Sequence, residues 1–298
     1  MNAEKVLPKK LIHKKGKSGT RLSRSRFGSF ILFLFLLMIA SFMFVPLFYA
    51  VVQAFKPMEE VLAFPPKFFV RNPTLNNFMQ VFQLAQNLWV PFSRYAFNSI
   101  WVSAVGTGVY IIIASLAAYP LSKHKFPGKK ALMLLVVWAL LFRPEVMGVA
   151  QYIIISKLNL INSNGSIILP ALASTLGVFL MNQFMGFSIP ESTLEAARID
   201  GASEYRIFFK LVMPMVKPAW MTLIIFTFQS LWNTTGVNYI YDESLKMLPS
   251  VLSTIAAGGI ARVGAGSAVA VLLMIPPILI FIFSQNSIME TMSHSGLK

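Results

Sequence analysis

The chain contains no cysteine and few charged residues. Without thiols it can form neither a disulfide framework nor a thiolate metal site. Only 12% of its 298 residues are charged and 56% are hydrophobic, whereas soluble domains carry roughly 25% charged residues. This balance excludes an ordinary soluble domain and indicates an integral membrane protein.

A nucleotide-binding loop is also missing. Gly16-Lys17-Ser18 matches the end of a P-loop, but the glycine that must stand five residues before Gly16 is replaced by Leu11. His124 stands alone in the sequence, so we expect no metal site around it. We predict that the chain is not an enzyme and holds no cofactor or metal of its own.

Acidic residues are scarce as well. The chain has 11 Asp and Glu against 26 Lys and Arg, which gives a net charge of +15. In a soluble protein this excess would suggest a nucleic-acid partner. The basic residues, however, cluster beside long apolar runs, where they set the orientation of membrane spans. We therefore expect contact with membrane lipid and no nucleic-acid partner.

Six apolar runs are candidates for membrane-crossing helices, which need about 20 residues each. The first run follows a basic tail, yet it is too long for the core of a signal peptide and has no clear cleavage site. We predict an all-α integral membrane protein with six transmembrane helices, over residues 27–55, 95–121, 131–155, 167–187, 218–240 and 266–283.

The distribution of Lys and Arg predicts how these helices are oriented. Nine lie in the basic N-terminal tail (1–26), four after the second run, four after the fourth and one in the C-terminal tail (284–298), against six in the proposed external segments. Cytoplasmic loops carry such an excess. We therefore predict a transmembrane domain over 27–283, with both termini cytoplasmic. Its segment 56–93 should be external and contain one short helix.

Charged residues interrupt the third run at Arg143-Pro144-Glu145. A charge within a span is costly and usually faces water or a protein interior, and Pro144 should break the helix. Arg143 and Glu145 therefore belong to a translocation path or gate, form a structural ion pair, or mark a helix end near the outer membrane surface.

The fifth run carries a polar patch formed by Gln229, Trp232 and Asn233. An indole face beside amide groups suits a sugar, which presents apolar C–H faces and hydroxyls. The alternative is hydrogen bonding between helices. In the sixth run, Pro276-Pro277 should kink the helix or free backbone groups toward a cavity.

A polar island, residues 188–217, separates the fourth and fifth runs. We expect a helix that begins with a capping box formed by Ser188 and Glu191. Gly201 permits the left-handed conformation that ends a helix, and a second short helix can start at Ser203. The island therefore predicts a helix–turn–helix outside the membrane.

The pattern of this island, E-A-A followed by a glycine and a proline, resembles the EAA loop of permease subunits of bacterial ABC importers. In that family the loop is the coupling element that docks in a cleft of the ATP-hydrolysing subunit. The resemblance implies this role for Glu195, Ala196, Ala197, Arg198, Asp200, Gly201 and Pro214. Further stretches resemble carbohydrate-type permeases, namely Asn98-Ser99, Ala118-Tyr119, Phe126-Pro127-Gly128 and Trp232-Asn233. An ordinary amphipathic loop between two spans is the alternative.

The resemblance implies a maltose-type permease subunit in the bacterial cytoplasmic membrane that imports carbohydrate, expected to be an oligosaccharide, by alternating access. Its implied partners are a second homologous permease, a dimer of ABC ATPase subunits that bind ATP and Mg²⁺, and an extracellular solute-binding protein. An ion-coupled secondary transporter and a non-transporting membrane scaffold stay open as alternatives. The former usually has carboxylates within its spans, where this chain offers only Glu145.

Overall fold

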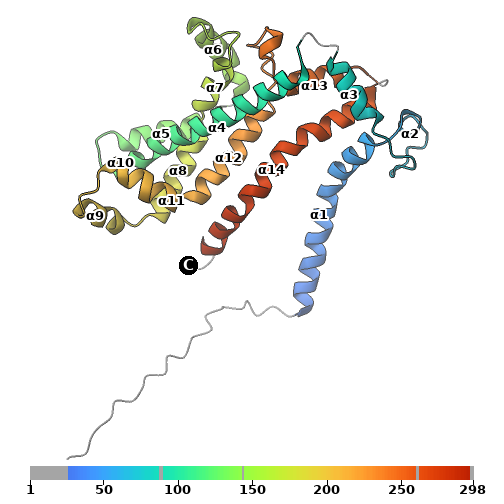
Figure 1. Cartoon of the computed structure of the whole chain (residues 1–298). Coiled ribbons are helices and arrows are strands. Elements are labelled where there is room, and N and C mark those ends of the chain that lie inside the picture. The colour runs from blue at the N-terminus through green and yellow to red at the C-terminus, as the bar shows by residue number, and fades with distance from the viewer. Residues whose placement is uncertain (1–25, 87–89, 143, 260–261, 296–298) are drawn as a thin grey trace, which may run out of the picture. The chain divides into compact units, whose positions relative to one another are not determined.

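The computed structural model describes residues 26–86, 90–142, 144–259 and 262–295. Its contacts divide the chain into two compact units, Met1–Phe48 and Tyr49–Lys298. Every regular element of the described residues is helical (Figure 1). This result confirms the predicted all-α class. The predicted N-terminal tail lies almost entirely outside the described residues.

The first unit contributes most of one long helix, α1 (Arg26–Ala54). The stretch Phe27–Ala54 has 28 residues, and an 18-residue segment within it has a mean hydropathy of 2.7. Apolar residues occupy all sides of this helix, which is the pattern of a membrane span rather than of a surface helix. The helix continues through Pro46. It corresponds to the first predicted span.

The second unit is organised around α4 (Phe92–Lys123), which has 32 residues. At 1.5 Å per residue this helix is about 48 Å long. It packs against α7 (Gly165–Leu172), α8 (Thr175–Ser188) and α12 (Lys217–Trp232). On its buried face, small residues such as Ala114 and Ser115 allow this close packing.

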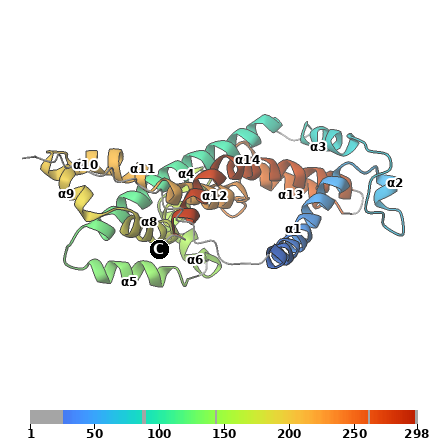
Figure 2. The same ribbon diagram turned by 90° about the horizontal axis from the view of Figure 1, so that it is seen from below.

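The remaining helices of this unit lie at its two ends and along its side (Figure 1 and Figure 2). Both views place α9 and α10 at one end and α3 and α13 at the other. The elements not yet bounded are α2 (Met58–Val61), α3 (Asn76–Gln86), α5 (Lys129–Ala139), α6 (Pro144–Lys157), α9 (Glu191–Ile199), α10 (Glu204–Ile207), a π-helical turn (Phe208–Val212), α11 (Met213–Met215), a 3₁₀ turn (Glu243–Leu245), α13 (Leu248–Ala256) and α14 (Val263–Ser295). Helix α3 confirms the short helix expected in segment 56–93.

Among the described residues, four helices are long and apolar enough to cross a membrane: Phe27–Ala54, Phe92–Lys123, Gly165–Ser188 and Val263–Gln285. A fifth is counted if Glu204–Met215 and Lys217–Trp232, which meet at 77°, form one span. The third predicted span is not among them, because α5 and α6 are separate helices of 11 and 14 residues.

One predicted span boundary is wrong. The fifth run leaves the helical conformation after Trp232 rather than at residue 240, and a turn at Gly236 (φ 67°) follows. Val237 and Ile240 make the sequence look continuous, although the polar residues 233–235 have already ended the helix. The last apolar span, Val263–Gln285, ends close to the predicted residue 283, and helix α14 continues beyond it to Ser295.

Helix α8 begins with a cap supplied by another helix. Its N-cap residue Ser174 makes no side-chain capping bond. The hydroxyl of Tyr110, on α4, accepts a hydrogen bond from Gly177 N (2.6 Å) and donates one to Ser174 O (3.0 Å). The hydroxyl therefore satisfies an N–H of the first turn that would otherwise have no partner. A Cβ on Gly177 would stand 2.7 Å from Tyr110 Cζ, so the contact requires glycine.

We expect Gly177→Ala to destabilise the protein by about 1–3 kcal/mol, because the added methyl group collides with a buried ring. Gly108→Ala is the matched control, since a Cβ at this helical glycine meets nothing within 4 Å. Alanine should there be neutral or stabilising, by up to about 1 kcal/mol. Thermal unfolding of the purified variants measures both effects. Equal midpoints for the two variants would contradict the packing argument.

Candidate functional site

The polar island folds as two helices joined by a tight turn, as predicted. Helix α9 ends in a left-handed residue, Gly201 (φ 76°). Gly201 N donates to Arg198 O (3.0 Å) and Ala202 N donates to Ala197 O (3.0 Å). These two bonds form a Schellman motif, which satisfies the last carbonyls of the helix. Ser203 then caps α10 by accepting a hydrogen bond from Arg206 N.

The predicted start of the first helix is wrong. Ser188 is the last residue of α8, and Pro190 is the N-cap of α9 without a side-chain capping bond. The break between the helices falls at Ile189, which is extended (φ −112°, ψ 109°) because it precedes a proline. Lys123 Nζ donates to Ile189 O (2.6 Å) and Gly186 O (3.2 Å), so α4 satisfies the end of α8.

One face of the helix–turn–helix is buried against α4 and α8. Leu194 on α9 and Ile207 on α10 are 2% and 1% exposed. They belong to one apolar cluster with Phe208, Met185 and Tyr119. This packing holds both short helices in a fixed position on the longer ones.

Glu204, at the start of α10, ties the turn to the end of α4. Its carboxylate accepts hydrogen bonds from Arg198 Nε (2.7 Å) and from the Tyr119 hydroxyl (2.8 Å). His124 Nε2 lies 3.6 Å from the same carboxylate. The hydrogen bond to Glu204 raises the pKa of Arg198. Sequence reasoning missed this cluster.

The opposite face of the helix–turn–helix is open. Ile199 is 86% exposed and Tyr205 is 76% exposed, although both are large and apolar or aromatic. Of the seven residues that the EAA resemblance names, six are exposed (Glu195, Ala196, Arg198, Asp200, Gly201 and Pro214) and Ala197 is half-buried. Ile199 and Tyr205 together with these six exposed residues combine apolar, small and charged side chains, and we call this exposed set the loop face.

A bend connects this region to α12. The chain passes through the π-helical turn and α11, and then turns by 77° into α12. Pro218 lies in the first turn of α12, where a missing N–H costs no intrahelical bond. Pro214 lies near the end of the continuous helical stretch Glu204–Met215, just after the π-helical turn. Trp220 Nε1 donates to Met213 O (3.0 Å) and holds the bend from within.

The interruption of the third run is present as predicted. Helix α5 ends at Ala139 and α6 begins at Pro144. Arg143 lies outside the described residues, and so does the side chain of Glu145. Their suggested roles in a translocation path or an ion pair stay predictions.

The three residues of the polar patch on α12 do not share one face. Gln229 and Asn233 are exposed, whereas Trp232 is 2% exposed and stacks on Phe228 (5.8 Å between ring centroids). Trp232 Nε1 donates to Leu273 O (3.0 Å) on α14. Trp232 therefore forms a hydrogen bond between helices, as the alternative interpretation expected. Gln229 and Asn233 remain accessible.

The partner of Trp232 follows from the proline pair in α14. Pro277 has no N–H, so the carbonyl four residues earlier, that of Leu273, has lost its intrahelical donor. The indole N–H takes that place. The structure therefore confirms that the proline pair frees a backbone carbonyl. This carbonyl, that of Leu273, accepts a hydrogen bond from an indole instead of facing a cavity.

A second cluster lies at the other end of α4. The Tyr95 hydroxyl donates to Glu243 Oε1 (2.9 Å), and Lys246 Nζ donates to Glu243 Oε2 (2.6 Å). Asn98 Nδ2 donates to Ser244 O (2.8 Å). These bonds fasten the segment after α12 to the start of α4.

No protein-family model matches the chain. It is similar to the probable ABC transporter permease protein YurM of Bacillus subtilis, with 31% identity over 229 residues, 74% of this chain and 71% of that protein. It is also 29% identical over 274 residues to the arabinooligosaccharides transport system permease protein AraQ of Halalkalibacterium halodurans, with 89% of this chain and 94% of that protein covered.

A solved structure shares the fold. It is a bacterial ABC transporter involved in the import of the acidic polysaccharide alginate, and one of its chains matches with a TM-score of 0.72 and 20% identity, over 88% of this chain and 98% of that chain. The chain thus belongs to the family of ABC transporter permease proteins. It is a multi-pass protein of the bacterial cytoplasmic membrane and a permease subunit rather than an enzyme.

Proposed function

We propose that this permease subunit serves an ATP-driven importer of oligosaccharides. The relatives carry the argument for the substrate class. Besides arabinooligosaccharides, they include a polygalacturonan/rhamnogalacturonan transport system permease protein, YtcP of Bacillus subtilis, at 29% identity over 88% of this chain. The exposed amides of Gln229 and Asn233 are suited to sugar hydroxyls.

The loop face is proposed as the docking surface for an ABC ATPase dimer, which binds the ATP and Mg²⁺. Its exposed Ile199 and Tyr205 are apolar groups that a partner would cover. Its small residue Ala196 permits close approach, and Glu195 offers a charge for pairing. The buried Leu194 and the hydrogen bond from Tyr119 to Glu204 pass any displacement of the loop face to α4. This arrangement supports rigid-body coupling during alternating access.

The proposed topology has six spans with both termini in the cytoplasm. Helix α5, which ends at Ala139, and helix α6, which begins at Pro144, together form the third span. The bend before α12 marks the entry of the fifth span into the membrane. The excess of Lys and Arg beside the loop face supports its cytoplasmic position.

Two further partners complete the proposed assembly, a second homologous permease and an extracellular solute-binding protein. A solved complex of the alginate ABC transporter with an alginate pentasaccharide-bound periplasmic protein matches this chain with a TM-score of 0.60 and 15% identity. The many exposed apolar residues of α4 and α14, such as Trp101 and Phe281, are surfaces for lipid or for the second permease.

Single cysteines test this proposal cleanly, because the chain has none of its own. Ala196→Cys, on the loop face, should form a disulfide with a cysteine placed in the cleft of the co-expressed ATPase, and it should resist membrane-impermeant maleimide in intact spheroplasts. Val237→Cys, exposed at the other end of α12, should be labelled and should not cross-link. Labelling of Ala196→Cys from outside would overturn the topology and the docking surface together.

Transport assays separate the proposed function from its two alternatives. In proteoliposomes with the companion subunits, uptake of arabinotriose or trigalacturonate should require ATP. The ATP should be needed on the side of the membrane where the loop face lies. Uptake driven by an ion gradient without ATP would identify a secondary transporter. A stable membrane complex that moves neither sugar under either condition would indicate a scaffold.

A further inference from the structure

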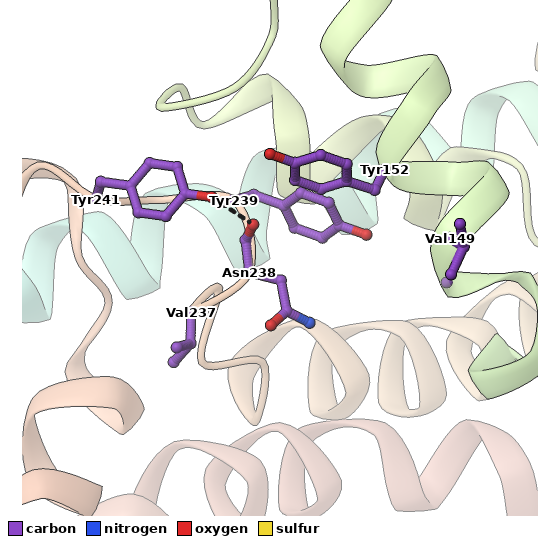
Figure 3. Close-up of a pocket in the computed structure, with 7 residues that line it drawn as sticks. Val149, Tyr152, Val237, Asn238, Tyr239 and Tyr241 are labelled. Carbon is purple, nitrogen blue, oxygen red and sulfur yellow. Dashed lines mark hydrogen bonds between the residues drawn. The ribbon is translucent and has the colours of Figure 1, made fainter.

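An open pocket lies between α6 and the loop that follows α12, at residues 237–241 (Figure 3). Its volume is about 470 Å³, which falls within the range of ~300–1,000 Å³ found for small-molecule sites. Three tyrosines line it: Tyr152 comes from α6, and Tyr239 and Tyr241 come from the loop. Asn238 adds one amide, and the remaining described residues that line the pocket are uncharged.

The loop that carries two of the tyrosines is held in place by the chain itself. Gly236 (φ 67°) starts a turn in which its carbonyl accepts from Tyr239 N (3.0 Å) and Ile240 N (2.9 Å). Asn162 then clamps the loop from the turn before α7. Its N–H donates to Tyr239 O (2.7 Å), and its Oδ1 accepts from Tyr241 N (3.1 Å) and Asp242 N (2.8 Å). The pocket wall is thus preformed.

The aromatic rings form a platform. Tyr152 and Tyr239 are stacked, with centroids 6.1 Å apart and planes 21° from parallel, as Figure 3 shows. The Tyr241 hydroxyl donates to Asn238 O (3.3 Å), and hydrogen bonding with Tyr152 raises the pKa of Tyr241. Tyr152 and Tyr241 are 40% and 61% exposed, so their side chains are accessible to a ligand.

The pocket and the loop face lie at opposite ends of α12. The loop face precedes Lys217, and the pocket follows Trp232. The 16 residues of this helix separate the two ends by about 24 Å. If the loop face meets the ATPase in the cytoplasm, the pocket opens on the outer side of the membrane.

We infer that this pocket binds a saccharide unit at the outer mouth of the transporter. The C–H faces of a sugar ring match the tyrosine platform, and its hydroxyls match the three phenols and the amide of Asn238. Because the described residues that line the pocket carry no charge, we expect the tyrosine platform to bind neutral and acidic sugars alike. This inference rests on the proposed function, because it names a binding site for the same substrate class.

Saturation-transfer NMR on the assembled transporter, without the solute-binding protein, tests the inference. Irradiation of aromatic protons should transfer saturation to the C–H protons of arabinotriose or trigalacturonate. The double variant Tyr152→Ala/Tyr239→Ala should weaken binding about tenfold, because it removes both rings of the platform on which the sugar would lie. The double variant Tyr152→Phe/Tyr239→Phe retains the stacked rings and should keep most of the signal. Leu158→Ala, exposed just beyond α6 and outside the pocket, is the control.

The outcomes distinguish this inference from the proposed function. Wild-type protein that transports the sugar, with alanine variants that bind it as tightly as wild type, would overturn the pocket assignment alone. Wild-type protein that transports neither sugar would overturn the proposed function as well. Loss of signal in the alanine variants, with Leu158→Ala unchanged, would support the pocket.

Discussion

Gly201→Pro should abolish sugar uptake while the protein still inserts into the membrane. Gly201 has a φ of 76° and donates its N–H to Arg198 O. Proline fixes φ near −65° and has no N–H, so it removes both features at a cost of ~3 kcal/mol or more. The Schellman turn would open, and the two short helices would lose their mutual orientation. We expect transport and substrate-stimulated ATP hydrolysis to fall to background.

Gly201→Asn is the matched control for this change. A Cβ at residue 201 meets nothing within 4 Å, so side-chain volume is not the constraint. Asparagine tolerates the left-handed conformation better than other residues with a Cβ. Uptake by this variant should therefore stay within a few-fold of wild type. Full transport by Gly201→Pro, measured at equal membrane content, would contradict a coupling role for the turn.

Glu204→Gln should uncouple ATP hydrolysis from transport. The carboxylate accepts from both Arg198 and Tyr119, and charge-assisted hydrogen bonds are about twice as strong as neutral ones. The amide carries no negative charge, so the hydrogen bonds to Arg198 and Tyr119 lose their charge-assisted character and weaken. We expect uptake to fall about tenfold, equivalent to roughly 1.4 kcal/mol, while basal ATP hydrolysis by the assembled complex persists.

A cycle of variants shows whether Glu204 acts through Tyr119. Tyr119→Phe removes only the hydroxyl, and its effect should be smaller in a Glu204→Gln background than alone. Glu59→Gln, an exposed carboxylate in the segment between α1 and α4, controls for the charge change. Strictly additive losses for Glu204→Gln and Tyr119→Phe would show that the two groups act separately.

The sequence predicted the helices and the turn well because these features are local. The long apolar runs fix α1, α4 and α14, and Gly201 has the conformation that only its lack of a Cβ makes easy. The E-A-A pattern pointed to the surface that remains exposed in the structure. Its docking role stays a prediction.

The errors and omissions arise from contacts that are distant in sequence. Glu204 and Tyr119 are 85 residues apart, and Glu243 and Tyr95 are 148 apart, so no spacing rule brings them together. The expected capping box failed because Ile189, before a proline, set the helix boundary instead of Ser188. The end of the fifth run was missed because apolar residues continue past the turn at Gly236.

Helix α4 connects the two hydrogen-bonded clusters around Glu204 and Glu243, which lie at its opposite ends. Tyr95 contacts Glu243 near its first turn, and Tyr119 contacts Glu204 near its last. Between them the helix has no break over about 36 Å. A rigid-body movement of α4 would therefore displace both clusters at once, which is the long-range mechanical connection that the proposed alternating access requires.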